Sequence, residues 1–311
     1  MITLDRLTKK FGPILAVDGI SLDIRQGEVL GFLGPNGAGK TTTMRMVTGF
    51  LPATGGTAVV AGFDVAKDPI AVREKIGYLP EGAPLYGDMT PAAFLEFVAR
   101  MRGFSGTEAL RRVDWVVETL QLRDVLHRPI DTLSKGFKRR VGFAQAVLHD
   151  PDVLILDEPT DGLDPNQKHQ VRSLIRGMAE EKAVIISTHI LEEVEAVCTR
   201  SVVISDGRIV FDGTPRELQR RSEKHNCVEI RLDVESSAKL EKELAAHARV
   251  LRVDRGPTID GLAALIALSK DGRPIVHDLS ECIQASGVTI EEVHAERGDL
   301  SEVFRQLTTG V

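Results

Sequence analysis

Cysteine is scarce in this chain, which has only three cysteines in 311 residues. Cys198, Cys227 and Cys282 lie far apart and form neither a CxxC pair nor a metal-ligand spacing. An odd number of isolated cysteines argues against a disulfide framework and indicates reduced thiols in the cytoplasm.

Long hydrophobic runs are also missing. The opening residues, MITLDRLTKKFG, carry a charge every few positions and lack the apolar run of a signal peptide. The range 46–63 is uncharged and long enough to span a bilayer, but Gly49, Pro52 and further glycines interrupt it. We expect a helix end, a turn and a strand there, so any work at a membrane would require another chain.

An excess of positive charge is missing too, because 39 Lys and Arg stand against 45 Asp and Glu, for a formal net charge of -6. This balance gives no overall attraction to nucleic acid or to an acidic membrane, and we expect no nucleic-acid partner. A hydrophobic content of 42% and a charged content of 27% are typical of globular proteins. The length suits about two domains.

Two hydrophobic patterns predict the first domain. Up to Ile24, apolar and polar positions alternate, as in ITLDRL and ISLDI, which is typical of half-buried antiparallel strands. EVLGFLG, DVLILDEP and AVIISTH are continuous apolar runs, typical of parallel strands covered by helices on both faces. Helical spacing dominates residues 91–148. The patterns predict an α/β sheet domain with an antiparallel β subdomain and a helical insertion.

The composition changes at a charged stretch, QRRSEKHN, over residues 219–226. Beyond it, the patterns predict the order β, α, β, β, α, β, α, which fits a small ferredoxin-like domain. We therefore predict a first domain over residues 1–221, a linker, and an accessory α+β domain over residues 225–311.

The segment GPNGAGKTT matches the phosphate-binding pattern GxxxxGK[ST] and stands between a predicted strand and a predicted helix. Its glycines allow backbone N–H groups to face a polyphosphate, and the helix N-terminus adds partial positive charge. Lys40 is expected to reach the terminal phosphates, and Thr41 to bind Mg²⁺. The predicted binding residues are Gly34, Pro35, Asn36, Gly37, Ala38, Gly39, Lys40, Thr41 and Thr42.

Two later strands end in polar side chains, namely Asp157 and Glu158 in VLILDEP and His189 in IISTH. The carboxyl ends of parallel strands meet at one edge of an open α/β sheet, so these side chains are expected near the phosphate loop. Asp157 is the predicted magnesium ligand, and Glu158 is predicted to polarise the attacking water. His189 is predicted to hydrogen-bond a terminal phosphate or that water. The plainer alternative for the acidic pair is a solvated strand end or a helix cap.

Five spaced motifs together resemble the ATP-binding subunits of ABC transporters, over about residues 2–218. They are GPNGAGKTT (Walker A), YLPE (the Q-loop region), LSKGF (the signature), LILDEPTDGLD (Walker B with the D-loop) and STH (the switch). The resemblance implies a P-loop NTPase fold and hydrolysis of ATP with Mg²⁺. The phrase IGYLPEGAPLYGDMT looks like the gliding-motility-type ATPases that serve type-2 ABC exporters.

The resemblance also implies roles that the residues alone do not show. Phe11 would stack on adenine, although a place in the hydrophobic core is the alternative. Glu81 stands where the family usually has Gln, and its carboxylate can still ligate Mg²⁺. Ser134, Lys135, Gly136 and Asp164 would contact the ATP that a partner subunit holds.

The signature departs from the family's LSGGQ. Lys135 replaces the first glycine and Phe137 replaces the glutamine, while Ser134 and Gly136 are kept. Lys135 suits a loop that faces phosphate, or it is simply solvated.

The implied function is an ATPase that drives export through separate transmembrane permease subunits, from the inner face of the membrane. It would act as a homodimer or as a heterodimer with another ABC ATPase. One alternative is a soluble ABC ATPase that acts on ribosomes or DNA, but the sequence lacks the tandem units or long coiled-coil insertion usual there. Another is a scaffold with negligible turnover, against which Glu158 and His189 argue.

Overall fold

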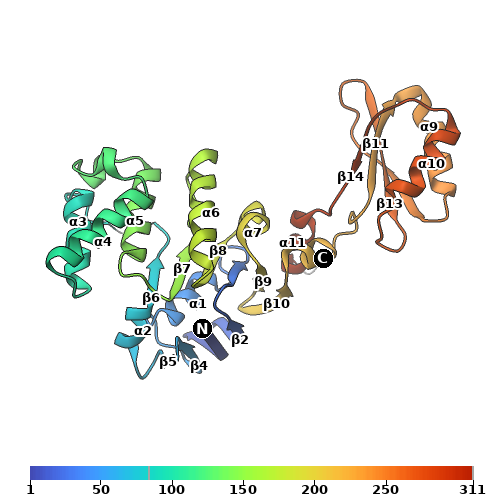
Figure 1. Cartoon of the computed structure of the whole chain (residues 1–311). Coiled ribbons are helices and arrows are strands. Elements are labelled where there is room, and N and C mark those ends of the chain that lie inside the picture. The colour runs from blue at the N-terminus through green and yellow to red at the C-terminus, as the bar shows by residue number, and fades with distance from the viewer. Residues whose placement is uncertain (83–84, 310–311) are drawn as a thin grey trace. The chain divides into compact units, whose positions relative to one another are not determined.

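A computed structural model describes residues 1–82 and 85–309 (Figure 1). The chain divides into two compact units, Met1–Gly213 and Thr214–Val311. In the described part of the chain, no helix combines the length and the apolar character that crossing a bilayer requires.

An antiparallel sheet forms one layer of the first unit. Its strand order is β2-β1-β4-β5, with β1 at Ile2–Phe11, β2 at Ile14–Ile24, β4 at Gly55–Val60 and β5 at Phe63–Asp64. Ile2 pairs with Ile24, and Leu4 pairs with Leu22. All four of these side chains are buried, whereas Thr3, between them, is exposed. The alternating pattern therefore predicted this sheet correctly.

The second sheet of this unit has the order β10-β9-β3-β8-β7-β6. Its strands are β3 Val29–Leu33, β6 Ile76–Leu79, β7 Val153–Asp157, β8 Ala183–Thr188, β9 Arg200–Ser205 and β10 Arg208–Gly213. β3 runs parallel to β8 and β9, and β7 runs parallel to β6 and β8. Every residue of β3, β7 and β8 is buried. The predicted parallel strands are thus confirmed.

Helices cover this sheet and connect its strands. They are α1 Lys40–Val47, α2 Pro69–Lys75, α3 Pro91–Met101, α4 Gly106–Thr119, α5 Lys135–Val147, α6 Pro165–Ala179 and α7 Leu191–Val197, with short 3-10 turns at Arg123–Val125 and Ile130–Thr132. Figure 1 shows α3, α4 and α5 grouped together in green. Leu154 and Leu156 of β7 pack into the core shared with these helices, while Val153 and Ile155 face the antiparallel sheet.

The second unit has the element order α, β, α, β, β, α, β, α. Its elements are α8 Pro215–Gln219, β11 Val228–Asp233, α9 Val234–Ala246, β12 Val250–Arg255, β13 Leu262–Ser269, α10 Val276–Ser286, β14 Ile290–Ala295 and α11 Leu300–Thr309. The antiparallel sheet has the order β12-β13-β11-β14, the arrangement of a split βαβ fold. Leu240 of α9 and Leu279 of α10 pack into the core of this sheet.

The division between the units falls after Gly213, earlier than the predicted domain end at Arg221. The cause is a contact between distant parts of the second unit. Ser222 Oγ donates a hydrogen bond to Glu302 Oε2 at 3.0 Å and accepts one from Asp299 N at 3.1 Å. The charged stretch that follows α8 is thereby fastened to the start of α11 and packs with the second unit.

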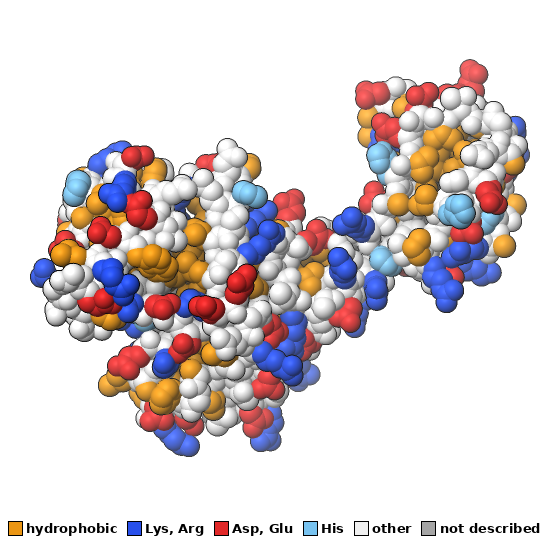
Figure 2. All heavy atoms as spheres, in the orientation of Figure 1, with side chains coloured by type: hydrophobic (Ala, Val, Ile, Leu, Met, Phe, Trp, Pro, Cys, Tyr) orange, Lys and Arg blue, Asp and Glu red, His pale blue; other side chains and the backbone are white. Residues whose placement is uncertain are grey.

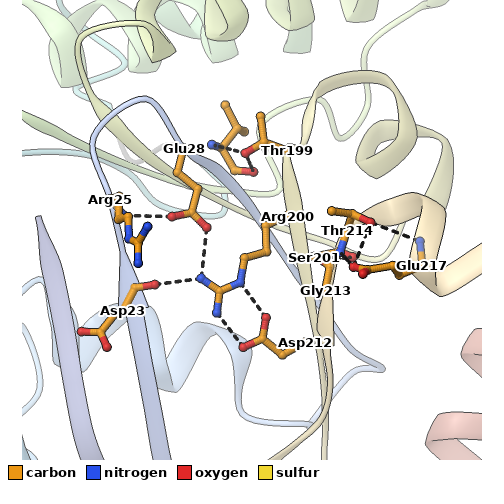
Figure 3. Close-up of polar contacts among 11 residues, drawn as sticks. Asp23, Arg25, Glu28, Thr199, Arg200, Ser201, Asp212, Gly213, Thr214 and Glu217 are labelled. Carbon is orange, nitrogen blue, oxygen red and sulfur yellow. Dashed lines mark hydrogen bonds and ion pairs between the residues drawn. The ribbon is translucent and has the colours of Figure 1, made fainter.

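A cluster of ion pairs and hydrogen bonds around Arg200 lies near the C-terminal end of the first unit (Figure 3). Arg200 Nε and Nη2 each donate to the Asp212 carboxylate at 2.6 Å, and Nη1 donates to Asp23 O at 2.9 Å and to Glu28 Oε1 at 3.1 Å. The hydrogen bond to Asp212 is the largest cause of the raised pKa of Arg200. The cluster ties β9 to β10 and to the ends of β2 and β3.

Candidate functional site

The phosphate loop lies between β3 and α1, as its sequence context predicted. Gly39 has a φ of 107°, and a Cβ there would stand 2.6 Å from Ala16 O. A Cβ on Gly34 would stand 2.6 Å from Ile204 O. Only glycine fits these two positions without displacement of the neighbouring backbone. The loop is therefore held against its neighbours in one tight conformation.

Lys40, the first residue of α1, turns back over this loop. Its side chain is buried, and Nζ donates to Gly34 O at 2.7 Å and to Pro35 O at 3.1 Å. Burial lowers the pKa of Lys40, and the carboxylates of Glu158, Asp157 and Glu81 act in the opposite direction. The ammonium group thus lies against the carbonyls of the phosphate loop, close enough to all three predicted acidic site residues to interact with them electrostatically.

Asp157 ends β7 with its carboxylate buried. Oδ1 accepts a hydrogen bond from Ser187 Oγ of the adjacent β8, while Oδ2 is buried with no hydrogen-bond partner. A buried carboxylate oxygen without a partner is costly unless a cation or a donor occupies the space beside it. Oxygen ligands of this kind suit Mg²⁺, and the hydroxyl of Thr41 in the loop would add a second one.

Glu158 and His189 meet at the ends of neighbouring strands. His189 Nδ1 lies 2.9 Å from Glu158 Oε1 and 2.8 Å from Oε2. The side chain of Glu158 is 12% exposed and that of His189 is 54% exposed, so the pair stands at the surface end of the sheet. A carboxylate and an imidazole in this position can together accept a proton and orient a water molecule.

Three residues around this pair were missed by sequence analysis. Ser187 donates a hydrogen bond to Asp157, whereas the sequence placed it only within the motif STH and gave it no role of its own. Thr188 Oγ1 donates to Glu193 Oε2 at 2.9 Å and accepts from Ile190 N at 3.0 Å. Thr188 and Glu193 thereby brace the turn that carries His189.

Glu81 and Phe11 are both exposed. Glu81 follows β6, and its negative charge acts to raise the pKa of Lys40 and that of Arg139. Phe11, at the end of β1, is 46% exposed, and Lys9 Nζ lies 5.1 Å from the ring centroid. This exposure removes the alternative that Phe11 is a core residue and leaves a ring face accessible to a planar ligand.

The signature residues stand at the start of α5. Ser134 is the N-cap and accepts a hydrogen bond from Phe137 N at 3.3 Å. Gly136 is buried, and a Cβ added there would meet only the amide end of the flexible Gln167 side chain of α6. Asp164 is the N-cap of α6, while Ser134, Lys135 and Asp164 are all exposed. These exposed groups are available to a partner.

Comparison with known proteins identifies the family. The family model described as ABC transporter matches residues 17–161. The daunorubicin/doxorubicin resistance ATP-binding protein DrrA of Streptomyces peucetius is 35% identical over 97% of this chain and 90% of its own length. The chain belongs to the ATP-binding subunits of ABC transporters. It is therefore an ABC-type ATPase that binds ATP.

Other comparisons agree with this family. The ABC transporter ATP-binding protein NatA of Bacillus subtilis is 37% identical over 73% of this chain and 96% of its own length. Among solved structures, an ATP-binding subunit of an ABC transporter superposes with a TM-score of 0.66 and 28% identity, covering 71% of this chain and 92% of that chain. The cbiO1 structure from Clostridium perfringens has a TM-score of 0.64 and 29% identity, covering 70% of this chain and 89% of that chain.

Proposed function

We propose that this ABC ATPase hydrolyses ATP at the site formed by Lys40, Asp157, Glu158 and His189 and so drives export through separate transmembrane permease subunits. The observation that carries the proposal is the convergence of these four side chains at one edge of the parallel sheet. DrrA is named for daunorubicin/doxorubicin resistance, and a 35% identical relative in Escherichia coli is described as a probable multidrug ATP-binding protein. Such relatives favour export over an action on ribosomes or DNA.

Each side chain has a defined task in this proposal. Lys40 leaves the loop carbonyls and binds the β- and γ-phosphates of ATP, while Phe11 stacks on adenine. The Glu158 carboxylate accepts a proton as the water oxygen bonds to the γ-phosphorus and the bond between that phosphorus and its bridging oxygen breaks. His189 hydrogen-bonds the γ-phosphate and holds Glu158 in place through Nδ1.

Thr41, Asp157 and Glu81 are the proposed ligands of Mg²⁺. The Oδ2 atom of Asp157 supports this choice, because it is buried without a hydrogen-bond partner and would gain one in a bound cation. When bound, the ion would supply positive charge that neutralises the negative charge developing on the phosphate oxygens.

The exposed N-termini of α5 and α6 are the proposed contacts to a second ATPase subunit. Ser134, Lys135 and Gly136, with Asp164, would bind the γ-phosphate side of the partner's ATP, so that ATP joins the two subunits and hydrolysis releases them. The second subunit is either a copy of this chain or another ABC ATPase.

A groove in the first unit is the proposed contact to the permease. It encloses about 650 Å³ between the end of α1, α2 and α3. Phe50, Ile70 and Met101 line it and are 75%, 73% and 71% exposed. An apolar groove of this kind suits a short segment of a membrane subunit at the cytoplasmic face. Figure 2 shows basic and acidic side chains interspersed over the visible face of this unit.

The substitution Glu158→Gln tests the reaction. It should slow hydrolysis by about 10²-fold or more, because a carboxamide does not accept the proton, while ATP binding persists. The variant should then accumulate as a dimer with ATP and return to monomer with ADP, measured by light scattering with labelled nucleotide. Adding Ser134→Arg should break the dimer without loss of bound ATP.

One result would contradict the proposed reaction, and another would decide between the two proposed partners. Wild-type turnover in Glu158→Gln would remove the general base. A Glu158→Gln protein that binds ATP yet stays monomeric at all accessible concentrations would exclude pairing with itself and leave a heterodimer.

A further inference from the structure

Arg139, on the second turn of α5, reaches from the helical group into the end of the main sheet. Its side chain is buried, and its guanidinium group donates to the backbone carbonyls of four residues. Nε donates to Pro159 O at 3.3 Å, Nη1 donates to Pro80 O at 3.1 Å, and Nη2 donates to both Asp157 O and Glu158 O.

The hydrogen bonds described above for this guanidinium group end on backbone carbonyls, and none of them ends on a carboxylate of a described residue. Burial is the largest influence on the pKa of Arg139 and lowers it, and nearby Asp157 and Asp161 act against this effect. An arginine nevertheless stays protonated in proteins, so a full charge is buried here with its hydrogen bonds made to backbone carbonyls and with carboxylates only in its vicinity. A neutral side chain could fill the same volume without this desolvation cost. Packing alone therefore does not explain why an arginine is buried at this position.

The backbone that Arg139 holds is strained. Glu158 has a φ of 51°, in the left-handed region that few residues other than glycine adopt. Its N–H donates to Ser187 O at 3.0 Å, and its carbonyl accepts from Asp161 N at 3.2 Å in addition to Arg139. Such a conformation costs on the order of 1–3 kcal/mol and persists only where surrounding bonds determine it. The same conformation aims the Glu158 carboxylate at His189.

We propose that Arg139 is a positioning residue for ATP hydrolysis: its guanidinium fixes the peptides of Asp157 and Glu158 and so aims the Glu158 carboxylate at the water to be activated. The inference rests on the proposed role of Glu158. Arg139 also joins three parts of the site, since Pro80 precedes Glu81 and α5 begins beside Ser134. A shift of α5 would therefore move the backbone of the catalytic carboxylate directly.

The substitution Arg139→Met removes the charge and the donors but keeps most of the apolar volume. We expect the kcat for ATP hydrolysis to fall about 10- to 100-fold, because a displacement of about 1 Å in a reacting group costs this much. The Kd for ATP should change less than about threefold, since Lys40 and the phosphate loop are untouched. Guanidinium chloride at low millimolar concentration should restore part of the kcat of an Arg139→Ala variant.

The matched control is Arg112→Met, in α4. Arg112 is also partly buried, with its side chain 22% exposed, and it donates to Glu108 at 2.6 Å and to Leu148 O at 3.2 Å, away from the strand end. Loss of a packed arginine lowers the thermal midpoint of both variants, but only Arg139→Met should lose kcat. If Arg139→Met does not fold, Arg139→Lys gives the same comparison, because one ammonium group replaces a planar fork that reaches four carbonyls.

Several outcomes would overturn the inference. One is a kcat for Arg139→Met within twofold of that of Arg112→Met. Another is an equal loss of ATP affinity and kcat without guanidinium rescue, which would show a merely structural brace. The Glu158→Gln variant separates the two proposals: if it is inactive while Arg139 variants are normal, only the positioning role fails. If Glu158→Gln retains wild-type turnover, the proposed base itself fails, and the positioning role fails with it.

Discussion

The two units of the chain bury different kinds of polar side chain. The first unit buries the charged groups Lys40, Arg139, Asp157 and Glu193, whereas the buried polar side chains described in the second unit are all serines. The five buried side-chain atoms without a hydrogen-bond partner, over the described residues, also belong to the first unit.

Burial of a charge is costly, so charged groups are kept inside a protein where they perform a task. Three of the four charged residues in the first unit lie within one network around the phosphate loop and the end of β7, and Glu193 braces the turn that carries His189. The serines of the second unit instead bond to nearby groups, for example Ser237 Oγ to Val234 O at 2.7 Å. The second unit is thus built as an ordinary small fold. We propose an accessory role for it, in contacts or regulation, without chemistry.

The largest expected effect would come from Lys40→Ala. If the buried charges of the first unit serve ATP, this substitution should weaken ATP binding about 10- to 100-fold, the worth of a charged hydrogen bond to phosphate. Binding of labelled ATP to the purified protein measures the change. Lys75→Ala is the control, because its ammonium group pairs with Asp152 at the surface. If Lys40→Ala binds ATP as tightly as the wild-type protein, the buried charge of Lys40 does not serve ATP binding, and the proposed difference between the two units loses its main support.

The sequence alone predicted the phosphate loop and the polar residues at the ends of β7 and β8. The glycines of the phosphate loop and the polar ends of β7 and β8 are set by what a polyphosphate and a parallel sheet require, and local patterns express these requirements. Neighbouring parallel strands bring Glu158 and His189 together, and the register pairs Asp157 with Ser187. Once the parallel strands are recognised, the residues that follow their carboxyl ends are expected at the same edge of the sheet.

Contacts between distant segments were not predictable. Nothing in the spacing of Arg139 shows that α5 folds back onto Pro80 and Glu158. The structure divides the chain after Gly213, whereas the sequence predicts a boundary at Arg221, because the charge of residues 219–226 resembles a solvated linker. Ser222, within this stretch, is buried and hydrogen-bonds to Glu302 of α11. Both depend on tertiary packing, which no local pattern encodes.

A smaller effect is expected for Glu81→Ala. Glu81 is exposed, so it contributes less to ATP affinity than buried Lys40. We expect the ATPase rate of the assembled transporter to fall about tenfold, with a change of less than about threefold in the Kd for ATP, because the role proposed for this carboxylate is to hold Mg²⁺ once ATP is bound. Glu180→Ala, at the exposed end of α6, is the matched control. An unaltered rate in the assembled complex would remove Glu81 from the site.

The smallest effect is expected from removal of the whole second unit. If that unit carries no chemistry, a fragment ending at Gly213 should bind ATP within about threefold of the full chain and unfold cooperatively. A fragment ending at Arg221 should be less soluble, because it exposes Leu218, which is fully buried in the intact chain. Isothermal titration and thermal unfolding of both fragments measure these differences.

The Arg200 cluster explains why the cut after Gly213 should be tolerated. Asp212 lies inside the shorter fragment and keeps its paired hydrogen bonds to Arg200, so the last strand stays fastened without any residue of the second unit. Asp212→Asn in this fragment should lower stability by about 0.5–1 kcal/mol, since the pair is partly exposed and therefore screened by solvent. A fragment ending at Gly213 that does not fold, while the fragment ending at Arg221 does, would show that α8 belongs to the ATPase unit and would move the boundary back toward the charged stretch.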